Sequence, residues 1–83
     1  MRIELFDVEI LDGFFSGIAV INNASEQIAV EVGYDIEYER LSLHNCDSVA
    51  YNPALSEYSD EELEDFIEEY YDDLTQEINS YID

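Results

Sequence analysis

The sequence predicts an α+β fold, in which a small antiparallel sheet of three to four strands, a meander, packs against one long C-terminal amphipathic helix. Three observations support this prediction. Residues 27–39 alternate between apolar and polar side chains with the period of a strand. Asp12-Gly13 is a typical two-residue hairpin turn. Residues 59–83 repeat apolar side chains at helical spacing. Because the strands come before one helix, we expect a single α+β domain over residues 1–83.

The first two predicted strands form a hairpin. Residues 2–11 alternate, but the apolar positions change parity near Phe6-Asp7, which is typical of a β-bulge. Asp12-Gly13 then predicts a type I′ turn. The second strand, residues 14–22, is apolar at both parities, so we expect partial cover on both of its faces. A turn follows at residues 22–25.

Residues 27–39 carry the clearest strand pattern, with a core-facing row and an acidic row. Same-face neighbours in a strand lie roughly 7 Å apart. We call the acidic row the strand acids, and they are Glu31, Asp35, Glu37 and Glu39. The core-facing row comprises Ile28, Val30, Val32, Tyr34, Ile36 and Tyr38.

The segment before the helix has weaker patterns. Leu41 and Leu43 predict a short fourth strand, and residues 45–48 predict a turn. Residues 49–51 predict another extended piece, followed by a loop that leads to the helix.

The C-terminal stretch begins with a capping box, because Ser59 has Glu62 three residues later. Acids in the first turn also suit the positive end of a helix dipole. Apolar residues from Leu63 to Ile82 form one stripe that is expected to face the core, and Tyr70, Tyr71 and Tyr81 belong to it. We therefore predict one helix of about 23 residues, about 35 Å long.

Composition limits the classes of partner. The chain has 22 acids, two Arg and no Lys, for a net charge of −20. That charge repels nucleic acid and anionic membranes, so we expect neither as a direct partner, and it attracts basic surfaces. Repulsion also favours a monomer or a weak dimer. The single Cys46 and an acidic N-terminus that does not resemble a signal peptide predict a cytoplasmic protein, and no apolar run is long enough to span a membrane.

The predicted helix concentrates this charge. Nine acids lie between Asp60 and Asp73, a length of about 20 Å, or about one negative charge per 2 Å of axis. B-form DNA carries one charge per about 1.7 Å of axis. Seven like-charge pairs at i,i+4 cost about 1–4 kcal/mol together at low salt. A structural helix usually softens such repulsion with Lys. The pattern therefore favours a function for the charge, and the alternative is an acidic face kept for solubility.

Motifs for catalysis or metal binding are weak. His44 and Cys46 could be part of a zinc site, but such a site needs four ligands and the chain has one His and one Cys. Asp47-Ser48 is similar to the attachment site of acyl carrier proteins, but those proteins are all-helical and the flanking sequence here is β-rich. The chain lacks a phosphate-cradling loop and a Lys. We predict a protein that is not an enzyme and has no cofactor or metal.

The leading functional prediction is a non-enzymatic inhibitor that mimics the charge of nucleic acid and occupies the DNA-binding site of a basic partner. A carboxylate array can exploit the attraction that basic proteins have for phosphates, and Arg–carboxylate pairs add geometric fit. Tyr71, at the edge of the apolar stripe, is expected to be partly exposed and to engage Arg. The predicted partner-binding residues are Glu61, Glu64, Asp65, Glu68, Glu69, Tyr71, Asp72 and Asp73 of the helix, with Glu31, Asp35, Glu37 and Glu39 of the strand acids.

In its EELEDFIEEYYDD run, its lack of Lys and its size, the chain resembles the small DNA-mimic inhibitors of phages and mobile elements. That class includes anti-CRISPR and anti-restriction proteins. The resemblance implies a partner such as a CRISPR effector, a restriction enzyme or a nuclease, and a site of action in the host cytoplasm. It is a resemblance of charge pattern and not of an aligned motif. Two alternatives stay open: an immunity protein or antitoxin that caps a basic nuclease, and a halophilic acidic housekeeping domain.

Overall fold

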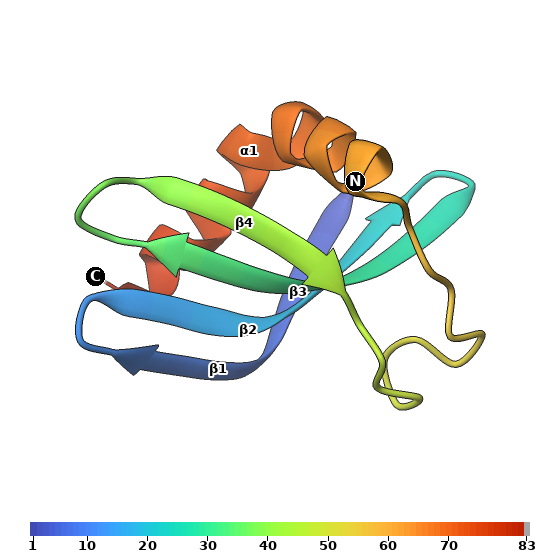
Figure 1. Ribbon diagram of the computed structural model, residues 1–83, viewed down its shortest axis with the longest axis horizontal. Helices are drawn as coiled ribbons and strands as arrows, with labels where there is room; N and C mark the ends of the chain where they lie inside the picture. Colours follow the sequence, from blue (N-terminus) through green and yellow to red (C-terminus); the bar gives the residue numbers. More distant parts are fainter. Residues whose placement is uncertain (83) are drawn as a thin grey trace.

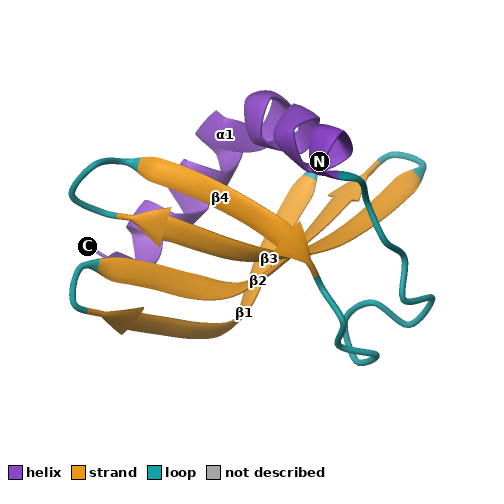
Figure 2. Cartoon of the chain, in the orientation of Figure 1, coloured by secondary structure: helices purple, strands orange, loops and turns teal. Residues whose placement is uncertain are grey.

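Four antiparallel strands form one sheet in chain order, and one long helix crosses a single face of it (Figures 1 and 2). The computed structural model describes residues 1–82, so Asp83 of the predicted helix lies outside the described residues. The predicted α+β class is confirmed. The elements are β1 (Arg2–Leu11), β2 (Phe14–Asn23), β3 (Glu26–Asp35), β4 (Arg40–Asn45) and α1 (Asp60–Ile82).

The capping box at the start of α1 is confirmed. The backbone N–H of Glu62 donates to Ser59 Oγ at 3.1 Å, and the backbone N–H of Ser59 donates to the Glu62 carboxylate at 3.1 Å. Two of the N–H groups that a helix start leaves unpaired are thus satisfied by side chains. The reciprocal pair fixes where the acidic run becomes helical.

The main core lies between α1 and the sheet. Leu74 and Ile78 of α1 are fully buried, and Phe15 and Ile28 of the sheet are fully buried in the same cluster. Every cluster member on β2, β3 and β4 belongs to the side-chain row that faces the helix. The cluster comprises Leu5, Phe15, Ala19, Ile21, Ile28, Val30, Val32, Tyr34, Leu41, Leu43, Leu63, Tyr70, Leu74 and Ile78.

The predicted bulge in β1 and the predicted turn after it are both confirmed. The β1–β2 register shifts between Phe6 and Glu9, and Asp7 has a φ of 52°. The bulge brings β1 so close to Gly17 that a Cβ there would lie 3.0 Å from the carbonyl oxygen of Phe6. Asp12 and Gly13 have φ values of 52° and 76°, as a type I′ turn requires.

The opposite face of the sheet is partly covered by the loop between β4 and α1, which is drawn in yellow in Figure 1. Val20 and Cys46 are buried there, so the predicted cover on both faces of β2 is confirmed. The Tyr51 ring stacks on Phe6 with 4.8 Å between ring centroids. Buried Asn52 holds the loop by donating to the carbonyl oxygen of Cys46 at 2.7 Å. The prediction of an extended piece at residues 49–51 is wrong, because these residues form turns.

The prediction that the third strand reaches residue 39 is also wrong. β3 ends at Asp35, whose Oδ1 accepts hydrogen bonds from the N–H groups of Glu37 and Tyr38 at 3.1 and 3.2 Å. A short polar side chain that bonds to nearby backbone in this way favours a turn over a ladder. The four residues 36–39 therefore connect β3 to β4, and Glu39 has a φ of 53°.

Two tyrosines that the pattern assigns to the core are not buried. Tyr38 is 72% exposed because it lies in the β3–β4 turn rather than on a strand. Tyr81 is 50% exposed, although its hydroxyl donates to the carbonyl oxygen of Leu5 at 3.5 Å. Tyr34 and Tyr70 are buried as predicted.

Replacing Leu74 with Ala should lower the free energy of unfolding by about 2–5 kcal/mol, because it leaves a cavity beneath the helix. Urea denaturation followed by far-UV circular dichroism measures the loss. Gln76→Ala, at an exposed position of the same helix, is the matched control and should change stability by less than about 0.5 kcal/mol. Equal effects of the two changes would contradict the role assigned to this face of α1.

Candidate functional site

A row of exposed acids runs along α1 on the side away from the sheet. Glu61, Asp65, Glu68 and Asp72 follow one another by four, three and four residues, so they share one line of the helix surface, with Glu69 beside it. All five side chains are exposed. We call Glu61, Asp65, Glu68, Glu69 and Asp72 the outer acids. From Glu61 to Asp72 they span about 16 Å of axis.

The outer acids have no basic partner within residues 1–82. The salt bridge in this part of the chain joins Arg2 to Glu4 at 3.3 Å, on exposed side chains of β1. Arg40, at the start of β4, lies opposite Asp35 of β3 in the register of the sheet. No salt bridge within residues 1–82 therefore offsets the outer acids. They are held in place by the buried side chains on the other side of the same helix.

The other predicted helix residues are placed differently. Glu64 lies beside β4 and lines a groove there, while Asp73 is half-buried on the opposite flank of α1. Tyr71 is half-buried, as predicted, but its hydroxyl donates to the carbonyl oxygen of Glu39 at 2.7 Å. This bond occupies the hydroxyl with the protein's own backbone and ties α1 to the β3–β4 turn.

The strand acids do not form the single ladder that the sequence predicts. Glu31 and Asp35 belong to the row of β3 that faces away from α1, whereas Glu37 and Glu39 lie in the β3–β4 turn. The turn lies at the same end of the sheet as the β1–β2 turn, and the N–H of Ile36 donates to the carbonyl oxygen of Gly13 at 3.0 Å (Figure 1). The structure thus brings Glu39 close to α1 and leaves Glu31 on the far side of the sheet.

Residues at the junction between α1 and the β3–β4 turn affect the pKa of a buried tyrosine, Tyr34. Burial raises the pKa of Tyr34, and the charges of Tyr71 and Glu39 raise it further. Its hydroxyl therefore stays neutral at physiological pH, as its buried position requires. Tyr34 is a structural neighbour of the site and adds no charge to it.

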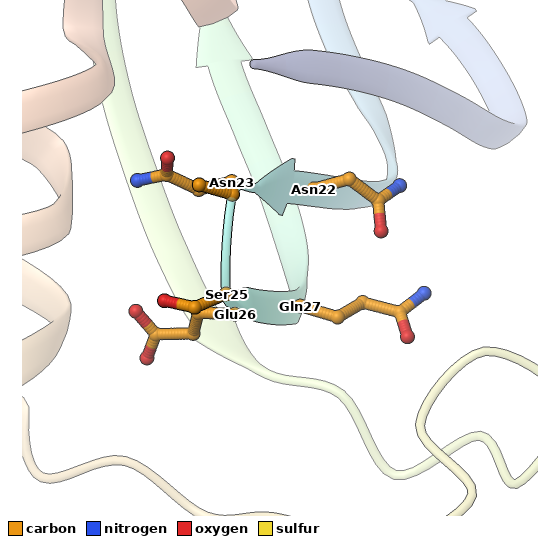
Figure 3. A pocket seen from close by; sticks show the side chains of 6 residues that line it. Asn22, Asn23, Ser25, Glu26 and Gln27 are labelled. Atoms are coloured by element: carbon orange, nitrogen blue, oxygen red, sulfur yellow. The ribbon is translucent and has the colours of Figure 1, made fainter.

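A hollow with a volume of about 450 Å³ lies at the turn of the β2–β3 hairpin. It is lined by six consecutive residues, 22–27. Figure 3 shows Asn23 and Glu26 pointing to one side of the hairpin and Asn22 and Gln27 to the other. The polar groups diverge instead of converging on one point, so this hollow does not have the geometry of an enclosed ligand site.

Sequence reasoning missed a groove between α1 and the edge of the sheet. Its walls are β4 and the first two turns of α1, and His44, Asp60 and Glu64 are among the residues that line it. Of these, only Glu64 was predicted to bind a partner. The signal in the sequence is the spacing of Asp60, Leu63, Glu64 and Ile67, which places acids beside apolar residues on one flank of a helix.

Among residues 1–82, no three His, Cys, Asp or Glu side chains lie where they could hold a metal ion together. Within the same residues, the helix α1 is too polar to cross a membrane. Comparison with known proteins gave no match, whether to a protein family, to a curated protein or to a solved structure.

The crowding of the outer acids should make the site costly to stability. Asp65 lies four residues from both Glu61 and Glu69, so Asp65→Lys turns two repulsive pairs into attractive ones. We expect this variant to gain about 1 kcal/mol in the free energy of unfolding at low salt, with a smaller gain at high salt. Urea denaturation at about 20 mM and about 500 mM salt measures both effects.

Asp47→Lys is the matched control, because it makes the same charge change at an exposed loop position outside α1. Its gain should be much smaller. If both variants gain equally, the repulsion is a property of total charge and not of the outer acids.

Proposed function

We propose that this protein is a non-enzymatic inhibitor that presents a nucleic-acid-like charge surface and occupies the DNA-binding site of a basic partner. The observation that carries the proposal is the row of outer acids, which are exposed, have no salt-bridge partner within residues 1–82, and lie on a helix whose other side is buried. A charge array on a fixed helix loses little conformational freedom on binding, so it competes better than a disordered acidic tail.

The spacing of charge supports mimicry of a nucleic acid. The outer acids place five carboxylates along about 16 Å of axis. This is about one charge per 3 Å, close to the spacing of about 3.4 Å between the phosphates of one DNA strand along the helix axis, so a partner that binds phosphates with Lys and Arg meets a single-strand density of charge here. Arg can also form bidentate pairs with carboxylates, which adds geometric fit to simple attraction.

Within this class, we propose that the protein acts in the cytoplasm of a bacterial host and blocks target-DNA binding by a CRISPR effector complex. This finer statement rests on the resemblance in charge pattern to phage inhibitors. The main core contains large apolar residues, among them Phe15, Tyr70 and Leu74, which counts against a halophilic housekeeping domain because such proteins tend to thin out large apolar side chains.

Reversing three outer acids should abolish inhibition. The variant Glu68→Lys, Glu69→Lys, Asp72→Lys should fold, because all three side chains are exposed. The measurement is displacement of fluorescent target duplex from CRISPR effector complexes of the host, by anisotropy. We expect at least a hundredfold higher concentration for half-displacement with the variant, since each reversal removes an attraction and adds a repulsion.

The control variant is Glu9→Lys, Asp47→Lys, Glu57→Lys, at three exposed positions outside α1. Three reversals, each worth two charges, change the net charge from −20 to −14 in both variants. The control should retain most of the inhibition, and displacement by the natural protein should weaken between about 50 and 500 mM salt. Equal inhibition by the two variants, or displacement that ignores salt, would disprove charge mimicry by the outer acids.

A further inference from the structure

The free edge of β4 offers unpaired backbone groups. Within residues 1–82, β4 is the last strand of the sheet and pairs with β3 alone. The hairpin pair Asn23–Glu26 closes a two-residue turn, so these two residues bond to each other. The backbone groups of successive strand residues point alternately to the two sides of the strand. Counted along β3 from Glu26, this alternation turns the groups of Gly33 toward its partner Ser42 on β4. The N–H and C=O groups of Ser42 therefore face β3, and those of Leu41 and Leu43 face the open edge. The β1–β2 hairpin, counted in the same way from its own turn, predicts the same alternation.

A groove of about 300 Å³ runs along this edge. Four consecutive residues of β4 line it, from Leu41 to His44. Because their side chains point alternately to the two faces of the sheet, the feature that all four share is the backbone edge. The opposite wall is one flank of α1, formed by Asp60, Leu63, Glu64 and Ile67 at positions i, i+3, i+4 and i+7. Each wall is about 10 Å long, which matches three to four residues of extended chain.

The side chains of the groove define the chemistry that it accepts. Leu63 and Ile67 give it an apolar centre, and Asp60 and Glu64 are exposed acids beside them. Within residues 1–82 neither acid forms a salt bridge. An incoming strand can therefore satisfy the backbone edge, bury a small apolar side chain and place a cation next to each acid.

We propose that this groove binds an extended segment of a partner protein as a fifth strand of the sheet, antiparallel or parallel to β4. Because alternate side chains of a strand face opposite ways, the row of the segment that faces α1 carries both kinds of residue, a β-branched residue with Lys or Arg two positions away on each side. The β-branched residue packs against Leu63 and Ile67, and the basic residues pair with Asp60 and Glu64. The bonding groups of Leu41 and Leu43 hold the backbone of the segment.

Charge decides between a basic partner and a second copy of this chain. Two copies that join at their β4 edges would bring together two molecules that each carry −20. They would also place Asp60 and Glu64 of both copies near the same junction. A basic segment removes this repulsion, so it is the occupant that the groove fits.

This inference goes beyond the proposed function, because it concerns backbone pairing at the sheet edge and not the outer acids. It holds for any partner with such a segment, whether or not that partner binds DNA.

The test uses a defined peptide, acetyl-Lys-Thr-Val-Thr-Arg-Thr-amide, whose first, third and fifth side chains form the row that faces α1, titrated into the full chain labelled with ¹⁵N. We expect the amide signals of Leu41 and Leu43 to shift most. A peptide N-methylated at every residue has no backbone N–H to donate to a strand edge, so it should bind about tenfold more weakly. A scrambled peptide of the same composition, acetyl-Lys-Arg-Thr-Thr-Val-Thr-amide, in which Val no longer lies between two basic residues of one row, should also bind about tenfold more weakly.

Two protein variants separate the groove from diffuse charge. Asp60→Lys with Glu64→Lys changes the groove, and Glu61→Lys with Asp65→Lys changes the adjacent outer surface, so both bring the net charge from −20 to −16. We expect about a tenfold loss of peptide affinity in the first and less than about threefold in the second. The variant Glu68→Lys, Glu69→Lys, Asp72→Lys should still bind the peptide, so failure of DNA mimicry and failure of the groove are distinguishable.

Three outcomes would overturn the proposal. Equal binding of the ordered, scrambled and N-methylated peptides would show that only charge matters. Shifts confined to the outer acids would place the contact elsewhere on α1. A dimer that forms with rising concentration and shifts Leu41 and Leu43 without peptide would assign the edge to a second copy. The peptide comparison needs no change to the protein, so it decides the question even if a variant fails to fold.

Discussion

Burial of α1 against the sheet is the interaction on which the rest of this structure depends. Leu74 and Ile78 are fully buried against a sheet that also buries Phe15 and Ile28 completely. Without that contact, the helical run from Asp60 to Ile82 would consist of mutually repelling acids with little to hold it in one conformation. The apolar side of the helix therefore stabilises the geometry of its acidic side. The acids gain a fixed spacing only because the core offsets their repulsion.

Local signals predicted much of this fold, and competition between local signals limited the prediction. The bulge near Asp7, the Asp12-Gly13 turn and the Ser59–Glu62 capping box each depend on residues close in sequence, so each could be found there. The residue at which β3 ends could not be found in this way. The alternation continues through Ile36 and Tyr38, but the Asp35 carboxylate bonds to the following backbone and starts a turn.

The candidate site divides in the same way. The outer acids follow from helical periodicity alone, because exposure of Glu61, Glu68 and Asp72 is fixed once the buried side of α1 is known. The positions of the strand acids depend on where β3 ends. The sequence predicts a strand that reaches residue 39, which places Glu37 and Glu39 on it, but they lie in a turn. The β4 groove requires the tertiary position of α1 beside one particular edge strand, which no single-sequence pattern contains.

The two proposed surfaces differ in what they recognise, and this difference gives them separate roles. In the proposed function, the outer acids attract a partner through charge at a distance, so they speed encounter and lose strength as salt rises. In the proposed strand pairing, the groove acts through short-range hydrogen bonds and an apolar contact of the partner with Leu63 and Ile67, which salt screens far less. A partner that uses both would be captured by charge and then fixed by backbone pairing. Because Glu64 lies next to the groove and four residues from Glu68 of the outer acids, one flank of α1 connects the two surfaces.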